Sequence, residues 1–82
     1  MVDLQPVRKM LRQLLVQRGD LEPFTDDEPL LSTGRLQSID GVELVVFLEE
    51  NFGIDFATIG FEQTALDSVA NIGALIQRAG RS

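Results

Sequence analysis

The chain has 82 residues, of which 44% are hydrophobic and 24% are charged. This length supports one small hydrophobic core, so we expect a single domain over residues 1–82. Cysteine and histidine are absent, which excludes disulfide bridges, thiolate nucleophiles, imidazole bases and metal centres built from these ligands. Seven basic and 13 acidic residues give a net charge of −6, which disfavours nucleic acids and anionic membranes as partners.

The first segment, residues 4–18, predicts an amphipathic helix. Asp3 is the expected N-cap, Pro6 fits the first turn, and Gly19 suits the left-handed position after the helix. The apolar residues at helical spacing are Leu4, Val7, Leu11, Leu14 and Leu15.

Residues 20–37 predict a long loop, because they hold Pro23, Pro29 and Gly34 and an acidic run at residues 26–28. Loops longer than about 12–15 residues are uncommon in compact domains and tend to be functional. The acidic run lacks the alternating spacing of a calcium loop, so we interpret it as solvated.

The segment from Ser38 to Phe52 predicts a second helix with two apolar faces. One broad face holds Leu44, Val45, Phe47, Leu48 and Phe52. The nearly opposite face holds three apolar residues interleaved with glutamates, namely Ile39, Val42, Val46, Glu43, Glu49 and Glu50. One core cannot easily bury both faces, so we expect the second face to be exposed.

The C-terminal part predicts a loop over residues 54–61, a short third helix near Glu62–Leu66, and a fourth helix over Ser68–Ala79. Asp67 or Ser68 is the expected cap of the fourth helix. The expected fold class is therefore all-α, a four-helix bundle with a long loop between the first two helices and a short third helix.

Ser38 stands where the long loop ends and the second helix begins. Serine is a favoured N-cap, which by itself explains this position. A hydroxyl at a helix N-terminus is also a good attachment point for a phosphate ester, because the free N–H groups and the helix dipole favour negative charge.

Residues 36–40, 42–45 and 48–54 resemble the acyl carrier protein family. The family shows Asp-Ser-Leu, then Val-Glu-Leu and Leu-Glu-Glu-x-Phe, where this chain has Gln37-Ser38-Ile39, Val42-Glu43-Leu44 and Leu48–Phe52. Gln37 departs from the usual aspartate. The lead-in at residues 32–36 is similar to that of stand-alone carriers of amino acids or specialised acyl groups.

The resemblance implies a 4′-phosphopantetheine group on Ser38, donated from coenzyme A by a phosphopantetheinyl transferase. Acyl or aminoacyl groups would then be carried as thioesters to enzymes of fatty acid, polyketide or related biosynthesis. It also implies that the second helix docks on basic patches of acyl-loading and acyl-using enzymes. The docking residues would be Ile39, Asp40, Val42, Glu43, Val46, Glu49 and Glu50.

The run Asp67-Ser68-Val69 matches the family signature more literally than the residues around Ser38 do. Only 14 residues follow Ser68, which leaves no room for a recognition helix and a closing helix. We therefore expect Ser68 to be a helix cap and Ser38 to be the modified residue.

Two other hypotheses compete with a carrier protein. One is an unmodified helical interaction module that binds a basic partner through the second helix. The other, a small carboxylate hydrolase, is disfavoured because adjacent Asp26 and Asp27 do not easily converge.

We expect no enzymatic activity, and a monomer in the cytoplasm. No apolar run approaches the roughly 20 residues of a membrane span, and the basic-then-apolar pattern of a signal peptide is missing.

Overall fold

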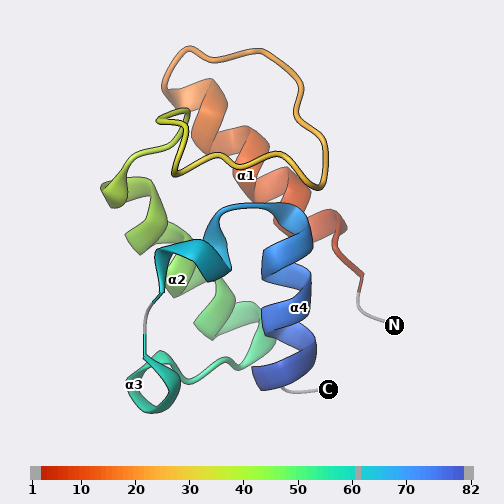
Figure 1. The fold of residues 1–82 in the computed structure, drawn as a ribbon, viewed down its shortest axis with the longest axis vertical. Coiled ribbons are helices and arrows are strands. Elements are labelled where there is room, and N and C mark those ends of the chain that lie inside the picture. Colours follow the sequence, from red (N-terminus) through yellow and green to blue (C-terminus); the bar gives the residue numbers. More distant parts are fainter. Residues whose placement is uncertain (1–2, 61, 81–82) are drawn as a thin grey trace.

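A computed structural model of the chain describes residues 3–60 and 62–80, and within these residues it is helical with no strand (Figure 1). The predicted all-α class is confirmed, and the three long helices begin and end within one residue of their predicted bounds. The helices are α1 (Gln5–Gln17), α2 (Ser38–Phe52), α3 (Phe56–Ile59) and α4 (Val69–Ala79), with a 3₁₀ turn η1 (Gln63–Leu66) before α4.

The third helix differs from the prediction. The short helix expected near residues 62–66 is the 3₁₀ turn η1, and α3 is an additional helical turn inside the predicted loop. Asp55 starts α3, because its carboxylate accepts hydrogen bonds from the Ala57 N–H (3.1 Å) and the Thr58 hydroxyl (2.7 Å). A four-residue helix is too short to show helical periodicity. Phe61, the last residue of the predicted loop, lies outside the described residues.

The two ends of α1 follow its sequence. The N-cap is Leu4 rather than the expected Asp3, whose carboxylate accepts a 3.0 Å hydrogen bond from the Gln5 N–H. Pro6 lies in the first turn, where its missing N–H leaves no helical bond unmade. Gly19 follows the helix with φ +80°, a left-handed conformation that glycine adopts without steric cost.

The core lies between α1, α2 and α4 and takes in the α1–α2 loop, residues 18–37. Leu30, Leu31 and Leu36 of this loop are buried with the helices, so the loop is part of the packed structure. In Figure 1 the loop passes over the upper end of α1 and returns to the start of α2. The helix residues that fill the core are Val7, Leu11, Leu14, Leu15, Leu44, Leu48, Val69, Ile72, Leu75 and Ile76.

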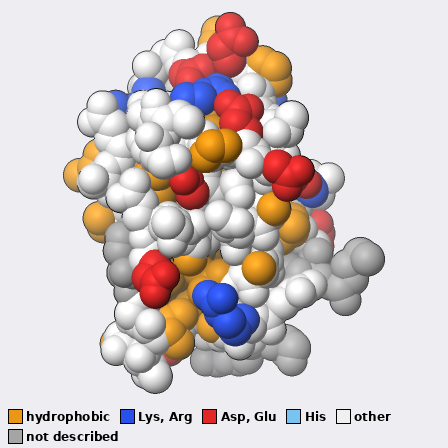
Figure 2. All heavy atoms as spheres, viewed as in Figure 1, with side chains coloured by type: hydrophobic (Ala, Val, Ile, Leu, Met, Phe, Trp, Pro, Cys, Tyr) orange, Lys and Arg blue, Asp and Glu red, His pale blue; other side chains and the backbone are white. Residues whose placement is uncertain are grey.

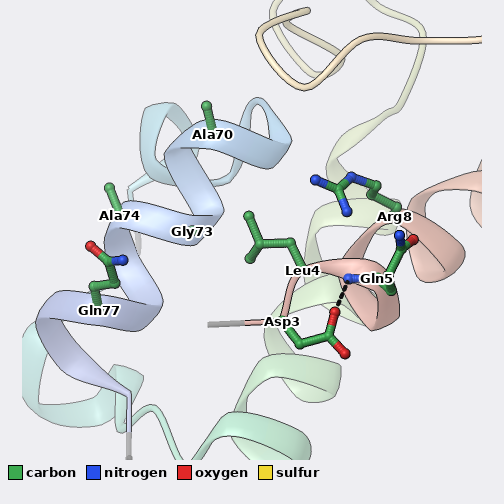
Figure 3. A pocket seen from close by; sticks show the side chains of 8 residues that line it. All are labelled: Asp3, Leu4, Gln5, Arg8, Ala70, Gly73, Ala74 and Gln77. Carbon is green, nitrogen blue, oxygen red and sulfur yellow. Dashed lines mark hydrogen bonds between the residues drawn. The ribbon is translucent and has the colours of Figure 1, made fainter. Parts of the chain in front are cut away.

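The start of α1 lies close to α4 because α4 has a glycine at the contact. The side chain of Leu4 points toward Gly73 (Figure 3). A Cβ at position 73 would lie 3.0 Å from Leu4 Cδ1, closer than nine in ten real Cβ contacts. Gly73 therefore allows the two helices to approach each other and keeps Leu4 at the edge of the core.

Candidate functional site

Ser38 is the first residue of α2, and the predicted N-cap role of its hydroxyl is wrong. Gln37 is the N-cap, in an extended conformation with φ −112° and ψ 173°. The Ser38 side chain is exposed, and its hydroxyl makes no hydrogen bond within the described part of the chain. The hydroxyl is therefore free to react at the N-terminal end of a 15-residue helix.

Asp40 does not lie on the exposed face of α2, which corrects its expected role in docking. It is only 6% exposed. Its carboxylate accepts a 2.9 Å hydrogen bond from the Gln37 N–H and forms a 3.2 Å ion pair with Arg18, just after α1. An acidic residue three positions after an N-cap commonly accepts a hydrogen bond from the N–H of the cap residue. The spacing of Gln37 and Asp40 in the sequence therefore already indicates this contact.

The outer face of α2 is made of the six other predicted docking residues, namely Ile39, Val42, Glu43, Val46, Glu49 and Glu50. All six are exposed, as predicted, and the apolar ones include Ile39 at 67% and Val42 at 58% exposed. They share an arc of about 120° on the helix, and Ser38 lies at its edge. Within the described residues, the three glutamates form no ion pair. This face combines an apolar stripe with unpaired negative charge.

Arg35, three residues before Ser38, holds the α1–α2 loop together. Its guanidinium donates to both carboxylate oxygens of Asp20 (3.0 and 3.1 Å), to Glu28 (2.7 Å) and to the carbonyls of Glu22 (2.8 Å) and Pro23 (3.2 Å). The bonds to Asp20 and Glu28 raise the pKa of Arg35 above its usual value. The bond from Arg35, with one from the Glu22 N–H, lowers the pKa of Asp20.

Two residues of the acidic run, Asp26 and Glu28, form ion pairs while they remain partly exposed to solvent. Asp26 accepts hydrogen bonds of 3.0 and 2.7 Å from the Arg8 guanidinium of α1, which lowers the pKa of Asp26. Figure 2 shows basic and acidic side chains next to one another at the top of the view, where Figure 1 places this loop. Among the described residues, no group of three acidic side chains is arranged to hold a metal ion.

Asp67, between η1 and α4, anchors the second half of the loop. This residue is buried, and its Oδ1 accepts hydrogen bonds from the backbone N–H groups of Leu30 (2.9 Å), Leu31 (2.6 Å) and Ser32 (3.0 Å). Burial alone would raise the pKa of Asp67, but hydrogen bonding by the Ser32 side chain and by these three N–H groups lowers it below its usual value. The sequence position of Asp67 predicts only a possible cap of α4 and gives no sign of this contact with the loop.

Ser68 is the N-cap of α4, as predicted. Its hydroxyl accepts a 3.1 Å hydrogen bond from the Asn71 N–H, and the residue is only 4% exposed. The run Asp67-Ser68-Val69, which is the more literal match to the Asp-Ser-Leu signature, therefore has a buried serine hydroxyl that is already hydrogen-bonded. The hydroxyl of Ser38 is exposed and makes no hydrogen bond within the described residues.

A shallow, open depression lies beside Ser38 where the loop, the start of α2 and η1 meet. Leu31, Gly34 and Leu36 of the loop line it, with Ile39 from α2 and Gln63 from η1. The depression mixes apolar and polar groups and borders the outer face of α2.

The sequence matches no family model and no curated protein. Within the described residues, no helix has both the length and the apolar character needed to cross a bilayer.

Proposed function

We propose that this chain is an acyl carrier protein that carries acyl or aminoacyl groups on a 4′-phosphopantetheine group attached to Ser38. The observation that supports this most strongly is the free, exposed hydroxyl of Ser38 at the first residue of α2. It lies at the edge of a face with unpaired glutamates and exposed apolar side chains. When bound, the group supplies a thiol on a flexible arm that holds the carried group as a thioester.

The charges around Ser38 are compatible with a phosphate ester. A helix N-terminus favours negative charge because its first N–H groups have no helical acceptor and the helix dipole is positive there. Asp40 is the acidic residue in this turn, and its charge is balanced by Arg18. Gln37, where the family usually has an aspartate, adds no charge. A phosphate at Ser38 therefore meets the helix dipole without an unpaired carboxylate in the same turn.

The outer face of α2 is the proposed docking surface for the transferase and for acyl-loading and acyl-using enzymes. Glutamates favour partners with basic patches and speed the encounter through long-range attraction. The exposed apolar side chains of Ile39, Val42 and Val46 supply area that is buried on contact. This proposal makes the chain a non-enzymatic, monomeric, cytoplasmic carrier in fatty acid or secondary metabolite biosynthesis.

Intact-mass measurement tests this proposal. The wild-type chain is incubated with coenzyme A and a phosphopantetheinyl transferase of broad specificity, beside a known carrier protein as the positive control. We expect one phosphopantetheine on the wild type and on Ser68→Ala, and none on Ser38→Ala. No modification of the wild type while the positive control is labelled would overturn the proposal. That result would favour an unmodified interaction module that uses the same face of α2.

A further inference from the structure

We propose that Arg35 is a positioning residue for the modification of Ser38. It fixes the loop that leads into α2 and so sets where the serine hydroxyl is presented to the transferase. This inference rests on the proposed function and adds a residue that lies outside the docking face.

The hydrogen bonds of Arg35 use its full capacity. A guanidinium has five N–H donors in a fixed plane, and Arg35 makes five hydrogen bonds to groups between Asp20 and Glu28. Its side chain is only 18% exposed. A lysine has three donors around one point and cannot reproduce this planar arrangement. One side chain thus joins the first half of the loop to the residues just before α2.

The residues between Arg35 and Ser38 are each held in place. Leu36 is buried, and its N–H donates a 2.9 Å hydrogen bond to the Leu30 carbonyl. The N–H of Gln37 donates to Asp40. Ser38 is the next residue in the chain. The position of its free hydroxyl therefore depends on the contacts of Arg35, Leu36 and Gln37.

Loss of the Arg35 charge also leaves two carboxylates without their cation. Asp20 and Glu28 both lie within 3.0 Å of the guanidinium, so without it they repel each other across the loop. We expect the loop to loosen at its C-terminal end, next to Ser38. The outer face of α2 is unaffected, because none of its residues contacts Arg35 through a hydrogen bond or ion pair in the described chain.

This separation predicts different effects on the two kinetic constants of the transferase. Docking through α2 sets how tightly the carrier binds, whereas the place of the hydroxyl sets how often the bound complex reacts. Misplacement of a reacting group by about 1 Å can lower a rate up to about 100-fold. Removal of Arg35 should therefore lower kcat and leave KM unchanged.

The experiment compares Arg35→Gln and Arg35→Lys with a matched control, Arg8→Gln. The control also removes a guanidinium that binds the loop, but its partner Asp26 lies 12 positions before Ser38. Transferase kinetics are measured over a range of carrier concentrations, after thermal melts show that each variant is folded. We expect Arg35→Gln to lower kcat at least about tenfold while KM stays within about twofold of the wild-type value. The kcat of Arg35→Lys should lie between those of Arg35→Gln and the wild type. Arg8→Gln should have the kcat and KM of the wild type.

The outcomes separate the two proposals. Failure of the wild type to accept the group overturns the proposed function, and this role with it. Equal kcat in the wild type and Arg35→Gln, or an equal loss in Arg8→Gln, overturns only the positioning role. Should Arg35→Gln not fold, Glu28→Gln removes one of its partners instead and is expected to lower kcat by a smaller factor. An unchanged kcat in that variant would count against positioning.

Discussion

The backbone N–H of Leu31 donates a 2.6 Å hydrogen bond to the carboxylate of Asp67, although 36 positions separate the two residues in the chain. Oδ1 of Asp67 also accepts from the N–H groups of Leu30 and Ser32, so one oxygen fixes three consecutive residues of the loop. These residues precede the start of α2 by only a few positions. The structure of the region around Ser38 therefore depends on an acidic side chain next to α4.

The first prediction concerns acid stability. The folded chain lowers the pKa of Asp67 below its usual value of 3.8, so near that pH the unfolded chain binds more protons than the folded one. The stabilisation is complete above the unfolded-state pKa and is lost as the pH falls through the folded-state pKa. Asp20 and Asp26 shift in the same direction, but they are more exposed and contribute less.

Urea unfolding of the wild type and Asp67→Asn between about pH 7 and about pH 3 measures this effect. We expect Asp67→Asn to cost about 1–3 kcal/mol at neutral pH, because three N–H groups lose a charged acceptor. Its stability should also change less with pH than that of the wild type. An equal loss of stability in acid for both chains would show that Asp67 is not the group responsible.

The second prediction contrasts two serines at helix starts. Ser68→Ala removes an N-cap bond and should destabilise the fold by about 1 kcal/mol. Ser38→Ala removes an exposed hydroxyl with no bond within the described residues and should change stability by less than about 0.5 kcal/mol. Denaturant melts of the two variants provide the comparison, and a larger loss in Ser38→Ala would contradict the assignment of Gln37 as the N-cap.

The third prediction separates the two faces of α2 by their contribution to folding. Leu48 is fully buried, so Leu48→Ala should leave a cavity and cost about 2–5 kcal/mol. Val46 is 47% exposed, so Val46→Ala should cost well under about 1 kcal/mol but weaken association with partner enzymes. Melts and transferase kinetics on the same samples test both halves. A large loss of stability in Val46→Ala would mean that this face is packed.

The fourth prediction concerns charge on the proposed docking surface. Glu43→Lys and Glu49→Lys should slow association with a basic partner without unfolding the chain, and the wild-type rate should fall as salt rises. Asp40→Asn is the matched comparison, because it changes an acidic residue of the same helix that is buried and paired with Arg18. That variant should lose stability while its association rate stays near the wild-type value. Stopped-flow association at several salt concentrations distinguishes the two outcomes.

Local patterns in the sequence were enough to predict the long helices. Helical spacing places Leu44 and Leu48 on one face of α2 and Val42 and Val46 on the opposite face. The structure confirms that the first face is buried and the second exposed. Such periodicity is a property of neighbouring residues, so it needs no knowledge of the rest of the fold.

Contacts between distant residues were not predictable in this way. The spacing of Asp40 from Gln37 indicates its local capping contact, but nothing near it in the sequence shows that Arg18 lies beside it in the fold. The contact of Asp67 with residues 30–32 and the five bonds of Arg35 depend likewise on how the loop folds over the helices. The carrier function and the modification of Ser38 stay predictions.

The ion pairs described above also affect the electrostatic potential around α2. Acidic side chains of the loop and of the first turn of α2 balance the charges of three arginines, namely Arg8, Arg18 and Arg35. The glutamates of the outer face of α2 have no such balance within the described residues. Because Arg18 and Arg35 near the start of α2 are already paired, the three negative charges give that face a negative potential. Within a Debye length of about 8–10 Å, a basic surface attracts this potential, so we expect an approaching basic partner to favour orientations in which α2, and with it Ser38, faces it before contact.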